Sequence, residues 1–193
     1  MPPLGSITPG QLREDVWNRL LLHRVAAYPT PPHGHHPNFV GVEQATARLL
    51  GLEQYRVART LLVGPDQVLK SLRRQALAAG KTLILPHPDR SHVYLKVEGV
   101  HPRRLQRIRE VRQLGTPIRL EEVVIDLVVI GCVAVDERLG WLGKGYGFPP
   151  PSLEVAAPWA TLAHPLMVFP QLPVTPERYL NLVVTPDETL VRP

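Results

Sequence analysis

The sequence predicts an α/β fold in which helices cover both faces of a mostly parallel sheet. Helical segments alternate along the chain with short apolar segments rich in β-branched residues, which is the pattern of strands joined by helical crossovers. Residues 123–135 read Val-Val-Ile-Asp-Leu-Val-Val-Ile-Gly-Cys-Val-Ala-Val and predict one central strand that is buried on both faces. The 193 residues, 44% of them apolar, suit a single domain over 1–193 with a sizeable core.

The first half of the chain predicts three helices and three strands. Thr8 is a suitable N-cap for the first helix and Pro9 suits its first turn, whereas the proline-rich segment 28–37 predicts a stiff loop. Asp66 is interpreted as the cap of the third helix, which Gly80 ends. The expected helices cover 8–26, 41–51 and 66–79, and the expected strands cover 59–63, 82–86 and 93–97.

The second half predicts a basic helix, a further helix and two short strands. The segment 101–113 is a candidate amphipathic helix, and its arginines form either a solvated basic face or a binding patch. These are Arg103, Arg104, Arg107, Arg109 and Arg112. Another helix is expected over 152–162, and strands are expected over 166–169 and 182–185.

Composition narrows the class of protein. The net charge of +5 is compatible with a nucleotide, a polyglutamylated cofactor or nucleic acid as ligand, and does not choose among them. No apolar run reaches the length needed to span a bilayer, and Met1–Gly10 lacks the pattern of a signal peptide, so we expect a cytoplasmic protein. The single cysteine, Cys132, lies in an apolar stretch and is interpreted as a buried, inert thiol in a reducing compartment.

A glycine-rich loop follows the predicted central strand, at the end of a parallel strand where open α/β sheets bind ligands. Gly143, Gly145 and Gly147 alternate, which lets the backbone approach an anion closely, and Lys144 adds a positive charge. Arg138 could bind the same phosphate through its planar fork. The spacing matches neither a Walker A loop nor a dinucleotide fingerprint, so a phosphate loop and a purely structural turn both remain open.

Residues 138–147 also resemble the signature loop of the 5-formyltetrahydrofolate cyclo-ligase family, the methenyltetrahydrofolate synthetases. The matching residues are Arg138-Leu139-Gly140 and Gly143-Lys144-Gly145-Tyr146-Gly147. Five further segments match in order: the first three are similar to the branch of methenyltetrahydrofolate synthetase domain-containing proteins, and the last two resemble the closing elements of the family. The resemblance therefore runs from about residue 12 to 187. These segments are 37–41, 80–86, 125–135, 171–173 and 182–186.

The resemblance implies a three-layer α/β/α sandwich like that of ribose-phosphate isomerases and CoA transferases. It implies that ATP phosphorylates the formyl oxygen of 5-formyltetrahydrofolate and that closure onto N10 gives 5,10-methenyltetrahydrofolate. The residues that would bind the ATP phosphates are Arg13, Arg138, Gly143, Lys144, Gly145, Tyr146 and Gly147. Phe39 is a candidate wall for the pterin or a core residue, and His87, with Asp89, either lines the pocket or lies in a surface turn.

The sequence departs from the family pattern at chemically important positions. The family loop usually ends in an aspartate that helps to hold magnesium, but Phe148 stands there, and a later Pro-His-Asp element is replaced by 176–178, Pro-Glu-Arg. The family pattern has a lysine four residues before Arg13, and in this sequence Pro9 stands at that position. These losses put magnesium binding in question, with Asp136 and Glu137 as possible substitutes.

Three histidines lie close together in the proline-rich loop. They are His33, His35 and His36. Their spacing lacks the second ligand pair of a usual zinc site, so a polar loop beside the substrate is favoured and no metal site is predicted.

Three functions remain open. They are an ATP-dependent folate cyclo-ligase, a family member that binds nucleotide or folate without turnover, and an RNA-binding module. The missing carboxylates favour binding without turnover, while the glycines, Lys144 and Arg13 keep the folate cyclo-ligase open. RNA binding is least favoured because no aromatic RNA-recognition pattern is present, and the sequence does not predict an oligomeric state.

Overall fold

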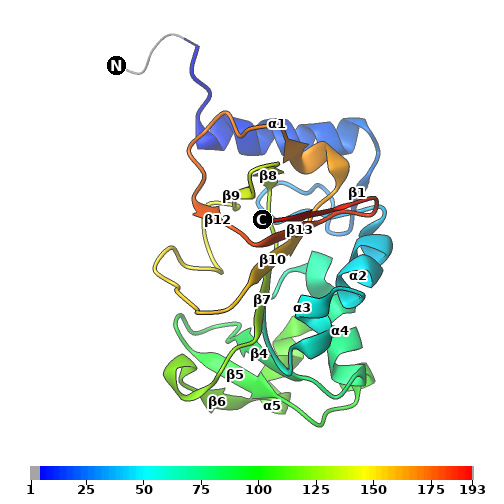
Figure 1. The fold of residues 1–193 in the computed structure, drawn as a ribbon, viewed down its shortest axis with the longest axis vertical. Helices are drawn as coiled ribbons and strands as arrows, with labels where there is room; N and C mark the ends of the chain where they lie inside the picture. Colours follow the sequence, from blue (N-terminus) through cyan, green and yellow to red (C-terminus); the bar gives the residue numbers. More distant parts are fainter. Residues whose placement is uncertain (1–4, 193) are drawn as a thin grey trace.

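The computed structural model describes residues 5–192 and contains a large eight-stranded sheet at its centre (Figure 1). Its strands lie in the order β14-β13-β10-β7-β3-β4-β5-β6. The run from β13 to β4 is parallel, and antiparallel pairing adds β14 at one end and β5 followed by β6 at the other. In chain order the strands are β3 (Thr60–Val63), β4 (Thr82–Pro86), β5 (Tyr94–Val97), β6 (Thr116–Ile118), β7 (Leu127–Ile130), β10 (Trp159–Leu162), β13 (Leu182–Val184) and β14 (Thr189–Val191). The predicted class, α/β with a mostly parallel sheet, is confirmed.

Helices pack along one side of this sheet and across its end. In Figure 1, α2, α3 and α4 lie together on one side, and α2 contacts β10 and β13 while α4 contacts β4. Helix α1 lies across the end of the molecule, near a second, smaller sheet (Figure 1). The helices are α1 (Pro9–Leu22), α2 (Val42–Leu50), α3 (Glu53–Val57), α4 (Lys70–Ala78) and α5 (Val111–Leu114).

The start of α1 follows the sequence prediction closely. Thr8 Oγ1 accepts the backbone N–H of Gln11 at 3.2 Å, and the Gln11 side chain accepts the N–H of Thr8 at 2.8 Å, so the two form a capping box. The helix ends at Leu22 rather than at residue 26 because Ala26–Ala27 (β1) pairs with Asn38–Phe39 (β2). The sequence prediction that residues 1–10 are not a signal peptide falls partly on residues 1–4, which lie outside the described residues.

The prediction of one central strand over 123–135 was wrong. The segment is divided between β7 in the large sheet and Ala134–Asp136 (β8) in the small sheet. The division falls where Val133 N–H donates to Leu142 instead of to a strand of the large sheet. Both strands are fully buried, so continuous apolarity could not show the change of partner.

The small sheet lies beyond β7 and contains four short strands in the order β11-β8-β9-β12. Strands β8 and β9 form an antiparallel hairpin, and β11 runs parallel to β8. Besides β8, its strands are β9 (Gly140–Leu142), β11 (Val168–Phe169) and β12 (Arg178–Tyr179). The glycine-rich loop follows directly from β9, so this hairpin fixes where the loop begins.

Three predicted helices differ from the structure. The helix expected over 152–162 is a loop followed by β10, a fully buried strand between β7 and β13. The basic helix expected over 101–113 is two 3-10 turns, η2 (Pro102–Arg104) and η3 (Ile108–Glu110), followed by the single turn α5. The helix expected from Asp66 begins as the 3-10 turn η1 (Gln67–Leu69), and the Asp66 side chain does not cap it.

Two more 3-10 turns complete the fold, η4 (Leu120–Glu122) and η5 (Pro165–Met167). Within the described residues, no helix has both the length and the apolarity that crossing a membrane requires.

Candidate functional site at the β3–β7 switch point

The order of the large sheet places a topological switch point between β3 and β7. From β3 the chain continues to β4 on one side, and from β7 it continues to β10 on the other. In open α/β sheets, ligands bind beyond the carboxyl ends of the two strands at such a point. The residues that follow these ends are Gly64 and Gly131, and a Cβ on Gly131 would lie 2.5 Å from the Cβ of His36. The glycine therefore admits the histidine into the switch point.

A buried histidine–aspartate pair occupies this position. His36 Nδ1 lies 3.1 Å from Asp66 Oδ2, and the two side chains are 1% and 8% exposed. His36 Nε2 accepts the backbone N–H of Lys144 at 3.1 Å, so in the neutral ring the network assigns the hydrogen to Nδ1. Nδ1 and Oδ2 are close in distance but do not form a well-directed hydrogen bond. The interaction between them is therefore mainly electrostatic.

Besides the histidine, two cations lie beside the aspartate. Lys144 Nζ lies 3.6 Å from Asp66 Oδ1, and the buried Arg73 guanidinium donates at 2.8 Å to the carbonyls of Gly64 and Asp66. Burial by itself would raise the pKa of Asp66, but the electrostatic attraction of His36, Lys144 and Arg73 outweighs it and lowers this pKa below its ordinary value of 3.8. Burial lowers the pKa of Arg73 to about 10, against the opposing effect of Asp66. Asp66 is thus an ionised carboxylate at the switch point, with Lys144 and Arg73 beside it.

The glycine-rich loop presents free backbone donors beside Lys144. Gly145 and Gly147 have φ values of +97° and +76°, in the left-handed region that favours glycine. Within residues 5–192, the N–H groups of Gly145, Tyr146 and Gly147 donate to no protein acceptor. Successive unpaired N–H groups with left-handed residues among them form concave sites for anions.

Arg13 connects helix α1 to this loop. Its Nε donates to the carbonyl of Gly143 at 2.7 Å, and its Nη2 pairs with Glu177 Oε1 at 2.5 Å. A Cβ on Gly145 would lie 3.2 Å from both Cζ and Nη1 of Arg13, so the guanidinium lies against the loop backbone. The structure therefore brings together Arg13 and residues 143–147, as the resemblance implied.

The other predicted site residues lie elsewhere. Arg138 is in the turn between β8 and β9 and, with residues 171–176, lines a different cavity of about 610 Å³. Phe39 is fully buried, edge-on to His164 with ring centroids 5.8 Å apart, which is the core alternative. His87 lies just after β4, where its Nδ1 accepts the N–H of Asp89 at 3.0 Å, as in the surface-turn alternative.

The three histidines of the proline-rich loop do not converge. His33 contacts Asn18 at 2.9 Å and Glu14 at 3.5 Å on α1, and the carbonyl of His35 accepts the Trp17 indole N–H at 3.0 Å. Only His36 enters the switch point. Within residues 5–192, no group of three or more His, Cys, Asp or Glu side chains is arranged to hold a metal ion.

Of the two candidate substitutes for the missing family carboxylates, Glu137 is exposed in the turn between β8 and β9, and Asp136 is not a free ligand. Asp136 Oδ1 accepts the N–H groups of Arg138 and Gly140, and its Oδ2 accepts that of Leu172, so this buried side chain fixes the hairpin turn. Phe148, at the place of the family aspartate, is buried edge-on to Tyr94 at 6.3 Å.

The contacts of two further side chains, Arg178 and Cys132, indicate structural roles. Arg178 donates to the Leu153 carbonyl and lies 4.1 Å from the Trp159 ring centroid. Burial raises the pKa of the Cys132 thiol to about 12, as fits the predicted inert thiol.

Sequence reasoning missed the central residues of the site. Local patterns indicate a helix cap at Asp66, a replaced motif at Glu177 and one member of a polar set at His36. The signal for Asp66 was its place just after β3, at a strand end where an α/β sheet binds ligands. Its neighbours His36 and Lys144 are 30 and 78 positions away in the sequence (66 − 36 and 144 − 66), so only the fold shows the cluster.

A separate cavity of about 870 Å³ adjoins the segment that follows the glycine loop. Its apolar walls include Tyr94, Ile125, Leu153 and Val155, and His92 and Arg119 contribute polar groups. Ligand pockets for small molecules have comparable volumes and a similar mixture of walls.

Comparison with known proteins agrees with this architecture. The 5-formyltetrahydrofolate cyclo-ligase family model matches residues 10–186. Methenyltetrahydrofolate synthase domain-containing proteins of Bos taurus and Mus musculus are 34% and 35% identical over 157 and 152 residues, or 77% and 74% of this chain. Each match covers 41% of the relative, so the chain spans about two fifths of the length of these curated relatives.

Two solved structures share the fold. The 5,10-methenyltetrahydrofolate synthetase of Aquifex aeolicus superposes with a TM-score of 0.63 at 18% identity, covering 93% of this chain and 92% of that one. The 5,10-methenyltetrahydrofolate synthetase of Mycoplasma pneumoniae gives 0.55 at 12% identity, covering 92% and 98%. The extent of the family match, supported by these relatives, shows that the chain belongs to the 5-formyltetrahydrofolate cyclo-ligase family.

Proposed function

We propose that the chain binds ATP, with the phosphates on the glycine-rich loop at the switch point. The observation that carries this proposal is the row of three free N–H groups at residues 145–147, next to the ammonium of Lys144 and the guanidinium of Arg13. Backbone donors and fixed cations of this kind are the usual means of holding transferring phosphates. The family membership of the chain supports the same choice of ligand.

Each residue of the loop has a distinct task in this proposal. The N–H groups of Gly145, Tyr146 and Gly147 donate to phosphate oxygens, and Lys144 supplies a point charge. Arg13 uses Nε and Nη2 for Gly143 and Glu177, which leaves Nη1 directed at Gly145. The guanidinium is therefore already oriented before a phosphate arrives, so little side-chain entropy is lost on binding.

We propose a reduced folate as the second ligand, on the basis of the family and of the names of the relatives. The cavity of about 870 Å³ beside residues 150–156 is large enough for it and has an aromatic wall in Tyr94. Filling this cavity by Val155→Trp should weaken folate binding and leave ATP binding unchanged in calorimetry. Equal folate affinity in the variant would remove the cavity from the proposal.

The finer activity is ATP-dependent conversion of 5-formyltetrahydrofolate to 5,10-methenyltetrahydrofolate. In that reaction the formyl oxygen attacks the γ-phosphorus, ADP leaves, and N10 then closes onto the activated carbon with release of phosphate. Lys144 and Arg13 would stabilise the charge on the transferring group. A binding role without turnover is the second candidate, and it is favoured by the commitment of Asp136 and Glu177 to structural contacts.

One assay separates these candidates. The protein is mixed with 5-formyltetrahydrofolate, ATP and magnesium, and the absorbance of the methenyl product is followed. If the wild type forms the product and Lys144→Met does not, the protein is a ligase. No product at high protein concentration, with ATP binding in calorimetry, establishes the binding role.

The ATP site itself has a matched control. Lys144→Met should weaken ATP binding by at least about ten-fold, because a fixed charge at the phosphates is lost. Lys70→Met changes a lysine that lines a different cavity and should leave the affinity unchanged. Unchanged affinity in Lys144→Met would refute the phosphate loop.

The free Cys132 agrees with a reducing compartment, and we retain the cytoplasm as the proposed location.

A further inference from the structure

The carboxylates nearest the glycine-rich loop lie beside cations or accept backbone N–H groups. Asp66 is surrounded by His36, Lys144 and Arg73, and its pKa is lowered by these groups. Glu177 pairs with Arg13 at 2.5 Å. Each of the two carboxylates therefore holds a cation that the proposed phosphate site needs.

The third nearby carboxylate is committed to the backbone. Asp136 accepts three N–H groups, at 3.0, 2.8 and 2.9 Å, and is 2% exposed. A magnesium ion in a nucleotide site is normally held by one or two protein carboxylates in addition to the phosphates. A metal ion on Asp66 or Glu177 would lie beside the cations that these carboxylates pair with, and like charges repel. A metal ion on Asp136 would displace the N–H groups that fix the turn between β8 and β9.

The residues present therefore do not fit a protein-held magnesium ion. The positive charge that such an ion would supply is already present in Lys144 and Arg13, at the edges of the free N–H groups of residues 145–147. Lys144 Nζ is 3.6 Å from Asp66, outside hydrogen-bond distance, so its donors remain available to a phosphate.

We propose that this site binds the triphosphate of ATP without a metal ion held by the protein. The inference rests on the proposed ATP site and deepens it. It has a direct consequence for affinity, because free ATP carries more negative charge than its magnesium complex. Fixed cations attract the more highly charged species more strongly. ATP should accordingly bind at least as tightly in EDTA as in magnesium.

Calorimetry with the full chain tests this inference at one ionic strength. ATP is titrated once in EDTA and once in excess magnesium chloride, and inorganic triphosphate is titrated under the same two conditions. We expect the Kd for both ligands to be equal or lower in EDTA. A Kd in EDTA more than about three-fold higher than in magnesium would overturn the inference, since it would require a metal bridge to the protein.

Variants separate this inference from the proposed function. Lys144→Met should weaken binding in both EDTA and magnesium, whereas the control Lys70→Met should weaken it in neither. Binding in magnesium alone refutes the metal-free site and leaves the ATP site standing. Binding in neither condition refutes the proposed ATP site itself, and the inference with it.

Direct metal binding gives an independent readout. Mn²⁺ is titrated into the protein without nucleotide, and the free ion is followed by its paramagnetic resonance signal. The metal-free site predicts no binding at micromolar Mn²⁺ in the wild type. Micromolar binding that Asp66→Asn removes, in protein that keeps its circular dichroism spectrum, would overturn the inference.

Discussion

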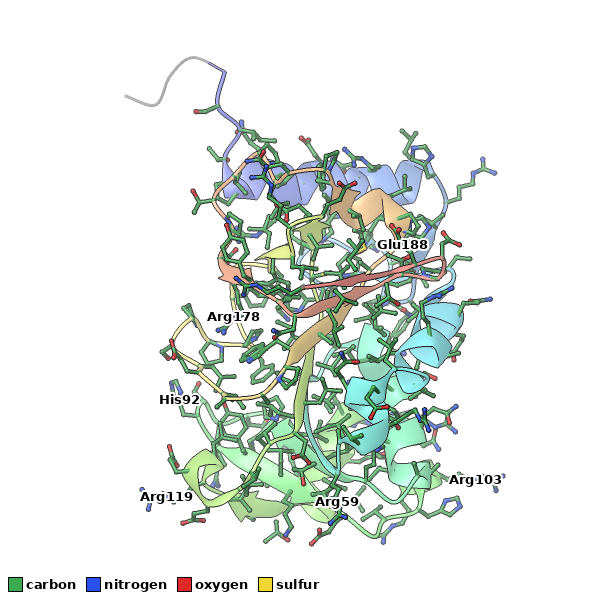
Figure 2. All side chains as sticks on the ribbon, viewed as in Figure 1. Arg59, His92, Arg103, Arg119, Arg178 and Glu188 are labelled. Atoms are coloured by element: carbon green, nitrogen blue, oxygen red, sulfur yellow. The ribbon has the colours of Figure 1, made fainter. Side chains whose placement is uncertain are left out.

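Two regions of this protein are rich in cations, yet the structure treats them in opposite ways. At the switch point, Arg73 and Lys144 are buried or nearly so, and each contacts Asp66 or its backbone. In the segment 101–112, the arginines lie on or beside short 3-10 turns and the single turn α5, and Figure 2 shows Arg103 at the periphery of the molecule. The pair Arg112–Asp89 in that region has side chains that are 46% and 54% exposed.

The difference teaches that the number of arginines does not locate a binding site. Charges in water are screened and gain little from pairing, whereas charges at a buried position interact strongly and must be compensated. The sequence showed five arginines between residues 103 and 112 and only one lysine in the glycine loop. The lone lysine has the surroundings of a functional group because Asp66, His36 and free N–H groups lie around it.

The largest expected effect comes from removing the compensating carboxylate. Asp66→Ala leaves Arg73 and Lys144 without their counter-charge and His36 without its partner, and should lower the free energy of unfolding by about 3–5 kcal/mol. Asp89→Ala, the matched surface variant, should lower it by less than about 1 kcal/mol. Urea denaturation of both variants measures the two values, and equal losses would contradict the contrast between the regions.

Acid should weaken the switch-point region through the same carboxylate. The pKa of Asp66 is lowered in the folded state, so its contribution to stability is full above 3.8, its ordinary value, and is lost as pH falls through the folded pKa. The free energy of unfolding of wild type should therefore fall more steeply below about pH 4 than that of Asp66→Asn. Urea unfolding between pH 2 and 7 measures both curves, and parallel curves would show that Asp66 is not specially stabilised.

Gly145→Ala should disturb the phosphate loop at a smaller stability cost. The φ of +97° strains any other residue, and the new Cβ would lie 3.2 Å from the Arg13 guanidinium, which must move. We expect a loss of about 1–2 kcal/mol in stability and a several-fold weaker affinity for ATP.

Gly80→Ala is the control for this strain. Gly80 has φ +75° and nothing within 4 Å of an added Cβ, so it should show the stability loss without a change in ATP affinity. Calorimetry and urea denaturation of both variants provide the comparison. A wild-type affinity in Gly145→Ala would argue against a role for Arg13 at the phosphates.

The smallest effect is expected at the basic surface. Arg112→Ala removes an exposed ion pair with Asp89 and should reduce the free energy of unfolding by less than about 1 kcal/mol. The reduction should disappear near 1 M salt, where exposed charges are screened within about 3 Å. Urea denaturation at low and high salt measures it, and a large loss that salt does not change would give this region a structural role that its exposure does not suggest.

The elements that the sequence predicted well are those fixed by local chemistry. The Thr8 cap of α1, strand β4 and the end of α4 before Gly80 follow from side-chain capping, apolar runs and a left-handed glycine. The prediction failed where a strand and a helix have the same apolar content, as in β10, and where one apolar run serves two sheets, as in residues 123–135. Hydrogen-bond partners distant in the chain decide those cases, and no local pattern contains them.

By itself, the sequence determined the α/β class, the family, and the glycines and cations of the proposed phosphate loop, because short segments and their order along the chain carry each of these. Only the tertiary structure decided which charges matter. It brought His36, Asp66 and Lys144 together beyond the ends of β3 and β7, placed Arg138 in another cavity, and buried Phe39 in the core. The physical reason is that burial and pairing depend on neighbours in space, and these set the strength of a charge far more than its identity does.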